Sequence, residues 1–330
     1  HSVSVSAGNP RGVTTPAFSV LLPTHQRPDV LGFAIKSVLA QSESSLELLV
    51  VGDGCDDATR EVVGGFRDPR IRFYDLPKAP GFGYANRNVA LREARGSLVA
   101  FAADDDLWLP NHLATLARLF HDSGAAWVHS RPAWVDRAGH VLPYAVNLAL
   151  LDELQHFLNT SNTLPASTVV HRRSLLDDVG YWPEDVPHSG DWHTWRAMIE
   201  ACKGQLASTR TITTLHFCAA WRTTDRSVPM SFRTLSTFAH DAPWWPPALM
   251  LDVSGVSEQA AAWRRLQASG GMWADHVNTA SDVALDRMAW AQVHPPSRLA
   301  STRTAERTRL LRAAWRASAV RHHLRRLLRP

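Results

Sequence analysis

The sequence predicts an α/β fold with a mainly parallel sheet, followed by a helical C-terminal extension. Short apolar runs alternate with segments of helical spacing from residue 18 to about residue 129, which is the pattern of strands joined by crossover helices. Three of the apolar runs lead directly into polar clusters, PTHQRP, GDGCDD and ADDD. Ligands of such folds bind beyond the carboxyl ends of the strands, so we expect these clusters to share one edge of the sheet.

The elements of the first part follow from hydrophobic periodicity. Buried strands are predicted where short apolar runs occur, at residues 18–23, 46–51, 71–74, 97–102 and 125–129. Helices are predicted where apolar residues recur three and four positions apart, at residues 28–39, 58–66, 84–94 and 110–121. Pro28 suits the first turn of its helix, because that position needs no backbone N–H.

The pattern loosens after residue 140. Strands are predicted at residues 167–170 and 212–217, and helices at residues 172–179 and 191–202. The segment APWWPP, residues 242–247, is a break, because proline suits neither a helix interior nor a central strand. Beyond it we expect helices to the end of the chain.

These patterns divide the chain into three regions. Residues 1–16 are polar and begin with His, so we expect a disordered segment, native, trimmed or left by cloning. Residues 17–225 are expected to form the main domain, and residues 226–330 a helical extension.

Composition sets limits on the class of protein. The chain has 330 residues and three cysteines, Cys55, Cys202 and Cys218, which are widely spaced. This spacing indicates neither a disulfide framework nor a zinc site, and favours a reducing, cytoplasmic compartment. No apolar run approaches the ~20 residues that a membrane-spanning helix requires.

The positive charge is concentrated at the C-terminus. Residues 303–330 hold nine arginines and one glutamate, so their formal net charge is +8. The whole chain has a net charge of +4, so the other residues together have a net charge of −4. Leu311, Trp315, Leu324 and Leu328 are spaced for one helical face. This helix suits a homo-oligomer contact or weak peripheral contact with a membrane surface. Nucleic acid is not expected, because the chain shows no recognised binding module.

Three consecutive aspartates, Asp104, Asp105 and Asp106, follow the predicted strand at residues 97–102. Like charges repel, so a basic neighbour or a metal ion is expected beside them. Mg²⁺ and Mn²⁺ prefer carboxylate oxygens and leave coordination positions for phosphate. The alternative is a turn in which aspartate caps the next helix. The residues alone leave both interpretations open.

The other two clusters carry weaker signals. Thr24, His25 and Arg27 offer a hydroxyl and a guanidinium that suit phosphate or ribose. Asp53 could accept a hydrogen bond from a base or a ribose. An ordinary turn explains each cluster as well. Arg87 follows the loop GFG, whose glycines are too few for a dinucleotide fingerprint.

As an ordered set these motifs resemble the inverting family 2 glycosyltransferases with the GT-A fold. The resemblance covers about residues 17–120 and rests on FSVLLPTHQRPDVLGFAIKSVLAQS, LELLVVGDGCDD, DPRIRFYDL, RNVAL and GSLVAFAADDDLWLPNHL. A weaker likeness, through STVVHRRSLLDDVG and GDWHTWRAMI, extends to about residue 217. It implies a Rossmann-like, mostly parallel mixed sheet flanked by helices, with a nucleotide-sugar half at residues 17–130 and an acceptor half at residues 131–225.

The resemblance also implies a donor and a cofactor. The donor is a nucleotide-diphosphate sugar, with a UDP-sugar favoured and a GDP- or dTDP-sugar as options, and the cofactor is Mn²⁺ or Mg²⁺. ADDD matches the DXD motif, which places Asp104 near the donor ribose or sugar and Asp105 on the metal, with Asp106 sharing that role. The remaining positions that match nucleotide or donor binding are Pro23, Thr24, His25, Arg27, Asp53 and Arg87.

The catalytic base that the resemblance implies is Asp191, at the start of a predicted helix. A carboxylate there would remove the proton of the acceptor hydroxyl, and Gly190 would leave room for a bulky acceptor. Asp191 could equally cap its helix. Trp182, His188 and Trp192 are expected near a glycan, lipid or small-molecule acceptor, although core packing suits the tryptophans and a surface position suits the histidine.

One departure and two alternatives accompany this interpretation. The family commonly has paired aspartates where this chain has Gly52 and Asp53, so a carboxylate is missing. If that carboxylate reads the base, its absence puts uracil recognition in question, and a donor with another base is an alternative. A sugar-1-phosphate nucleotidyltransferase is the first alternative, although PTHQRP lacks its glycine-rich loop. A non-catalytic nucleotide- or sugar-binding protein is the second.

Overall fold

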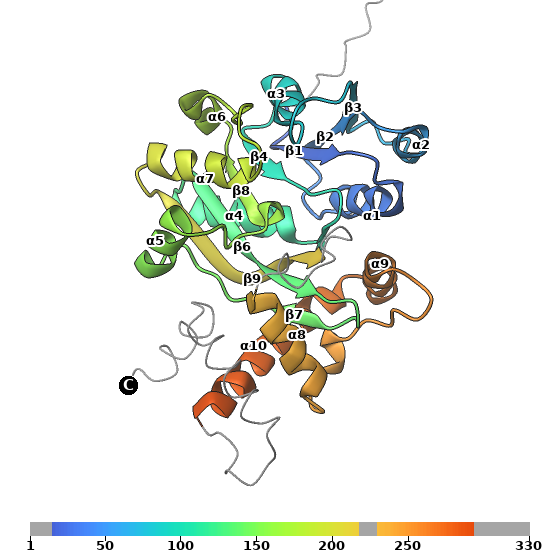
Figure 1. The fold of residues 1–330 in the computed structure, drawn as a ribbon, viewed down its shortest axis with the longest axis vertical. Coiled ribbons are helices and arrows are strands. Elements are labelled where there is room, and N and C mark those ends of the chain that lie inside the picture. Colours follow the sequence, from blue (N-terminus) through green and yellow to red (C-terminus); the bar gives the residue numbers. More distant parts are fainter. Residues whose placement is uncertain (1–14, 218–229, 294–330) are drawn as a thin grey trace, which may run out of the picture.

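The computed structural model describes residues 15–217 and 230–293, and it contains one mixed sheet with helices on both sides (Figure 1). The sheet has nine strands in the order β3-β2-β1-β4-β8-β6-β9-β5, with β7 paired to β6. The strands are β1 (Phe18–Thr24), β2 (Leu46–Asp53), β3 (Ile71–Leu76), β4 (Leu98–Phe101), β5 (Leu107–Trp108), β6 (Trp127–Val135), β7 (Val141–Pro143), β8 (Val169–Arg172) and β9 (Leu206–Phe217).

Helices join these strands and continue beyond them. Those of the main body are α1 (Pro28–Leu39), α2 (Asp57–Gly64), α3 (Tyr84–Arg92), α4 (His112–Ser123), α5 (Leu151–Asn159), α6 (Ser174–Val179) and α7 (Gly190–Ala201), with the short 3₁₀ turn η1 (Ala166–Thr168). The C-terminal helices are α8 (Met230–Asp241), α9 (Glu258–Ser269) and α10 (Met272–Val293), with η2 (Pro247–Leu249) between α8 and α9.

The first half of the sheet is parallel, as the alternation of strands and helices predicts. Strand β1 pairs in parallel with β2 and β4, and β2 pairs in parallel with β3. Leu21 lies opposite Leu49 on one side and Phe101 on the other. Strand β8 then runs antiparallel to both β4 and β6. The predicted α/β class, a mixed sheet flanked by helices, is confirmed.

The second half departs most from the prediction. The strand expected at residues 125–129 begins at Trp127 and continues to Val135, and every residue in it is buried. A fully buried strand shows no alternation of apolar and polar residues, so periodicity cannot mark its end. The strand expected at residues 167–170 begins as the turn η1. The sequence does not predict strands β5 and β7 or helix α5. Strands β5 and β7 have only two and three residues, too few to show a periodic pattern.

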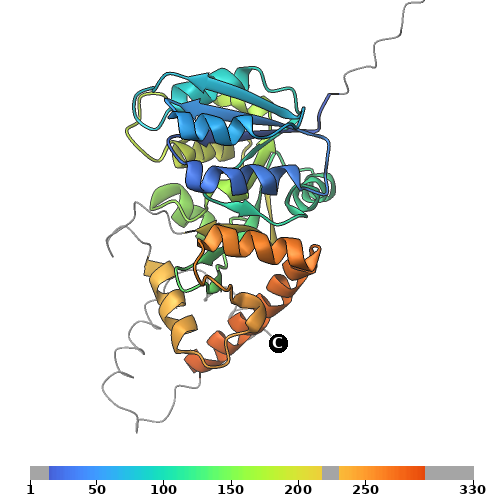
Figure 2. The same ribbon diagram turned by 90° about the vertical axis from the view of Figure 1, so that its right-hand side faces the viewer.

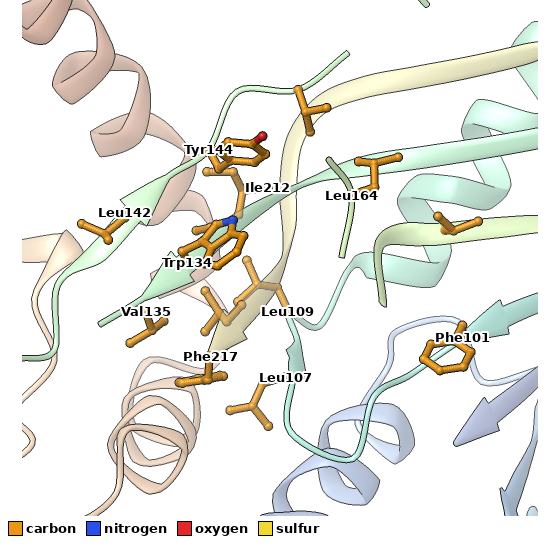
Figure 3. Close-up of a cluster of buried hydrophobic side chains, with 14 of the residues drawn as sticks. Phe101, Leu107, Leu109, Trp134, Val135, Leu142, Tyr144, Leu164, Ile212 and Phe217 are labelled. Carbon is orange, nitrogen blue, oxygen red and sulfur yellow. The ribbon is translucent and has the colours of Figure 1, made fainter. Parts of the chain in front are cut away.

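Helices α8, α9 and α10 pack together below the sheet body (Figure 2). Their buried side chains belong to the same hydrophobic cluster as the second half of the sheet, with Phe232 and Trp273 joining Trp134 and Trp195. Figure 3 shows part of this cluster, where Trp134 of β6 lies beside Tyr144 and Ile212. The helices expected in the C-terminal region are thus present as α8, α9 and α10, between residues 230 and 293. The arginine-rich segment 303–330 lies outside the described residues.

Within the described part of the chain, no helix is both long and apolar enough to span a membrane.

Three buried histidines support the sheet in the neutral state. His112 stacks on Trp108 with 4.1 Å between ring centroids, and its Nδ1 lies 2.7 Å from the hydroxyl of Thr213. His129 donates from Nδ1 to a backbone carbonyl and accepts at Nε2 from the Leu148 amide. Burial lowers the pKa of His112 to about 3 and that of His129 and His171 to about 4.

We expect the imidazoles of His112, His129 and His171 to stay neutral in the folded protein at pH 5. An exposed histidine titrates near pH 6.5, so at pH 5 each of these histidines is protonated in the unfolded chain but not in the folded one, which favours unfolding by roughly 2 kcal/mol per histidine. The stability from each neutral ring is complete above the unfolded pKa and is lost as the pH falls through the folded pKa. Side-chain ¹⁵N NMR between pH 8 and 5, assigned by single replacements, measures this. A midpoint above pH 6 in any of the three would contradict the expectation.

Candidate functional site

The carboxyl ends of β1, β2 and β4 bring the polar clusters together. Thr24 follows Pro23 at the end of β1, and its Oγ1 donates a hydrogen bond to Oδ2 of Asp104 at 2.8 Å. His25 donates from Nδ1 to the backbone carbonyl of Asp53 at 2.7 Å. Since these residues lie far apart in sequence, their contacts show that the predicted edge of the sheet is a single site.

The acidic loop, residues 103–106, divides its carboxylates between two environments. Asp104 and Asp105 face Arg27 of the N-terminal end of α1, whose Nη1 lies 3.8 and 3.7 Å from their carboxylate oxygens. Asp106 is turned inward, and its Oδ1 accepts from Nδ1 of His216 at 2.7 Å. Burial, followed by the charge of Asp105, raises the pKa of Asp104 to about 7. The surroundings of Asp104 therefore favour its protonated form, although Arg27 acts in the opposite direction.

The donor set of this loop fits a hard divalent cation. Among the described residues, no group of three or more His, Cys, Asp or Glu side chains surrounds a common point. Mg²⁺ is commonly held by one or two carboxylates together with substrate phosphates, and does not need a cage made of protein alone. Asp104 and Asp105 supply two such carboxylates side by side, both facing Arg27.

Asp53, the last residue of β2, is held in place by residues that sequence patterns do not reveal. Its carboxylate accepts hydrogen bonds from Lys78 Nζ at 2.7 Å, the Ala79 amide at 2.8 Å and Asn86 Nδ2 at 2.7 Å. Gly83 has φ +73°, and a Cβ there would collide with the Asp53 carboxylate. Loop 77–83 is thus wrapped closely around this carboxylate.

The structure gives a steric reason for glycine, and not aspartate, at position 52 beside Asp53. A Cβ at Gly52 would lie 2.8 Å from Sγ of Cys55 and 3.1 Å from the ring of Phe73. These two side chains occupy the space that a longer residue at position 52 would need. A carboxylate at that position is incompatible with this packing.

The guanidinium of Arg87 lies against the rings of Tyr84, Phe101 and Trp182, which are called the aromatic seat below. Its guanidinium carbon is 4.8 Å from the ring centroid of Trp182, 4.9 Å from Tyr84 and 5.6 Å from Phe101. Nη2 donates to the Phe82 carbonyl at 3.2 Å, and Nε has no hydrogen-bond partner among the described residues. Burial lowers the pKa of Arg87, while the charges of Asp191 and Asp104 act to raise it. An unsatisfied donor on a buried cation is suited to an anionic ligand.

Asp191 lies in the first turn of α7 and is partly buried. Its Oδ2 accepts from Asn162 Nδ2 at 2.9 Å. Burial raises the pKa of Asp191, and the nearby Arg87 opposes that rise. Gly190 is not open space for an acceptor, because a Cβ there would lie 2.5 Å from the ring of Tyr84. The Gly190 amide instead donates to the Tyr84 hydroxyl at 2.9 Å.

The expected acceptor residues occupy different surroundings. Trp182 is only 2% exposed and stacks between Tyr84 and Phe101, so its ring faces the core and Arg87. Trp192 is partly buried and donates from Nε1 to the Phe157 carbonyl at 2.8 Å. His188 is exposed and its Nδ1 lies 3.1 Å from the hydroxyl of Ser189. The aromatic seat of Arg87 leaves no mark in the sequence pattern, because its members come from α3, β4 and the segment before α7.

The chain is an α/β protein with charged and polar side chains gathered at the carboxyl edge of its parallel strands. Comparison with known proteins narrows this class. The family model described as Glycosyl transferase family 2 matches residues 19–169. The UDP-Glc:alpha-D-GlcNAc-diphosphoundecaprenol beta-1,3-glucosyltransferase WfgD of Escherichia coli is 38% identical over 182 residues, which cover 55% of this chain and 69% of that protein. The chain belongs to glycosyl transferase family 2.

Other relatives match shorter shares of their own length. The GalNAc(5)-diNAcBac-PP-undecaprenol beta-1,3-glucosyltransferase of Campylobacter jejuni is 36% identical over 103 residues, which cover 31% of this chain and 33% of that protein. The crystal structure of S. aureus TarS 1-349 in complex with UDP-GlcNAc matches with a TM-score of 0.50 and 17% identity, over 92% of this chain and 88% of that chain. The structural likeness supports the GT-A fold. Family membership favours a glycosyltransferase over the nucleotidyltransferase and the non-catalytic binding protein.

The contact between Gly190 and Tyr84 gives a test of how the helix carrying Asp191 is held. We expect Gly190→Ala to lower the free energy of unfolding by roughly 1–3 kcal/mol, because the new methyl group overlaps the Tyr84 ring. The matched control is Gly64→Ala, where no atom lies within 4 Å of the added Cβ. Urea unfolding of both variants measures the effect. Equal stability of the two variants would show that this contact is not tight.

Proposed function

We propose that the chain is a metal-dependent, inverting glycosyltransferase that transfers a sugar from a nucleotide-diphosphate donor to an acceptor hydroxyl. The observation that carries this proposal is the placement of two partly buried carboxylates around one cation. Asp104 of the acidic loop and Asp191 of α7 both interact electrostatically with Arg87. A donor bound at the sheet edge would then have its reacting sugar between the acidic loop and the base.

The donor is supported by the residues at the ends of β1, β2 and β4. Pro23 and Thr24 end β1, His25 and Arg27 follow before α1, and Asp53 ends β2. The carboxylates of Asp53 and Asp104 can accept hydrogen bonds from the nucleotide base and from the ribose hydroxyls. Arg87 offers Nε, which has no hydrogen-bond partner among the described residues, to a phosphate. A uridine diphosphate sugar is favoured, since the E. coli relative is named for UDP-Glc. GDP- and dTDP-sugars remain the alternatives.

The cofactor in this proposal is Mn²⁺ or Mg²⁺, held by Asp105 with Asp104 beside it. When bound, such an ion neutralises charge on the leaving diphosphate. Asp106 has a different part from the one implied by the family resemblance, because its carboxylate is engaged by His216 at 2.7 Å. We assign it to holding the acidic loop, with Asp105 as the principal ligand.

Asp191 is the proposed general base. In an inverting transfer the acceptor oxygen bonds to the anomeric carbon, the bond from that carbon to the diphosphate oxygen breaks, and a carboxylate takes the acceptor proton. Burial raises the pKa of Asp191 and so makes its carboxylate more basic. Asn162 fixes one oxygen at 2.9 Å, which orients the carboxylate.

For the acceptor we propose a sugar carried on a polyprenyl diphosphate. Two relatives are named for undecaprenol-linked diphosphate acceptors, and such an acceptor requires the enzyme to work at a membrane surface. Phe82, beside the Arg87 seat, is 56% exposed, and Leu151 at the start of α5 is 73% exposed. Trp192 and His188 lie next to Asp191 in sequence and remain the proposed acceptor contacts. Trp182 supports them from the core.

Nucleotide titration tests the donor and the metal together. We expect one of UDP, GDP and dTDP to bind at least tenfold more tightly with Mn²⁺ present, because the ion joins the acidic loop to the diphosphate. Isothermal titration calorimetry with and without Mn²⁺ measures the affinities. Asp105→Ala should remove the Mn²⁺ effect, and Asp57→Ala, which changes an exposed aspartate on α2, is the control. Failure of all three nucleotides to bind would reject the proposed function.

Replacement of Asp191 tests the base. We expect Asp191→Asn to lower kcat by roughly 10²–10⁴-fold, because the amide accepts no proton, and to leave nucleotide affinity within a factor of two. Sugar transfer from UDP-glucose to a synthetic polyprenyl-diphosphate GlcNAc acceptor measures the rate. Asp185→Asn, in the loop before α7, is the control. Full turnover of Asp191→Asn would remove Asp191 from this role.

A further inference from the structure

The acidic loop is held from outside the donor half of the sheet. The Ala103 amide donates to the hydroxyl of Ser167 at 3.0 Å, and the Asp106 carboxylate accepts from His216 of β9. Nε2 of Gln259 donates to the backbone carbonyl of Asp105 at 3.4 Å. Gln259 belongs to α9, 154 residues further along the chain. A helix of the C-terminal segment therefore reaches the loop that carries the proposed metal ligand.

The first route from the C-terminal helices to the loop runs through α9. Gln259 lies in the first turn of α9 and is only 7% exposed, which is unusual for a glutamine. The turn is fixed by Ser257, whose hydroxyl accepts from the Ala260 amide at 3.2 Å. Helix α9 also packs along α1 (Figure 2), whose N-terminal end carries Arg27. Gln259 and Arg27 thus approach the acidic loop from two helices that are packed together.

The second route runs through α8 and a row of aromatic rings. Phe232 of α8 lies 5.1 Å from Trp134, and Trp134 meets His216 edge-on at 4.6 Å between ring centroids. His216 then bonds to Asp106 at 2.7 Å. Trp134 and His216 are register partners of β6 and β9, so the sheet holds them side by side. Ser236 of α8 donates to the buried Asp136 at 2.6 Å, which fastens the helix to this end of β6.

We propose that α8 and α9 position the acidic loop, with Gln259 and Trp134 as positioning residues, so that the C-terminal helices form part of the donor site. Gln259 fixes the backbone at Asp105, and the row from Phe232 to His216 fixes the side chain of Asp106. Together with the bond from the Ala103 amide to Ser167, these contacts hold the loop on both sides of Asp105. The consequence for nucleotide binding rests on the proposed function, but the positioning of the loop does not.

Hydrogen exchange of the protein without metal tests the positioning directly. We expect Gln259→Ala to raise the exchange rates of the amides of residues 104–107 several-fold, because the Asp105 peptide loses its partner. Gln259→Glu, which keeps the size but cannot donate to a carbonyl, should raise them as much. Gln267→Ala, an exposed glutamine of the same helix, is the matched control. Unchanged exchange in both Gln259 variants would overturn the proposal.

A second measurement connects the loop to its ligand. Gln259→Ala and Phe232→Leu should each weaken Mn²⁺-dependent UDP binding by about 3- to 10-fold in calorimetry, with UDP affinity in the absence of Mn²⁺ unchanged. A merely structural role would instead lower the unfolding temperature and both affinities together. If the unaltered chain binds no UDP with Mn²⁺, the proposed donor fails while the exchange result still decides the positioning. If the unaltered chain binds and both variants match it, the inference fails.

Discussion

The structure depends on one electrostatic constraint: several carboxylates must remain close together at a partly buried edge of the sheet. Removing like charges from water and placing them side by side is unfavourable. The fold answers this by giving each carboxylate a basic partner. Lys78 pairs with Asp53, Arg27 faces Asp104 and Asp105, and His216 bonds to Asp106. Arg87 interacts electrostatically with both Asp104 of the acidic loop and Asp191.

The backbone around this site is shaped to permit these pairings. Gly83 adopts a left-handed conformation beside the Asp53 carboxylate, and Gly190 lets the ring of Tyr84 approach α7. Both glycines allow α3 or its leading loop to approach a distant segment closely. Helix α3 is also bonded to the segment before α7, because Asn88 donates to the Trp182 carbonyl at 2.9 Å and accepts from the Trp182 amide at 3.0 Å. Helix α3 therefore fixes the segment that leads into α7.

Sequence reasoning reaches the parts of this site that depend on strand ends. Alternating strands and helices predict a parallel sheet, and a parallel sheet brings Thr24, Asp53 and Asp104 to one edge, as the contacts of Thr24 and His25 show. It does not reach partners supplied by distant segments. His216 is 110 residues from Asp106, and Asn162 is 29 residues from Asp191. Nothing in the sequence pattern around Trp182 tells whether its ring packs against Arg87 or contacts an acceptor. Such assignments need the tertiary contacts.

Arg87 also links the two chemical roles that the site combines. Its charge lowers the pKa of both Asp104 and Asp191, opposing the burial that raises them. An arginine stays protonated in a protein, so Arg87 acts as a fixed positive charge that favours the ionised form of both carboxylates. Arg27 acts on Asp104 in the same direction. The aromatic seat of Tyr84, Phe101 and Trp182 matters for this reason, since it fixes the position of a cation that acts on both carboxylates.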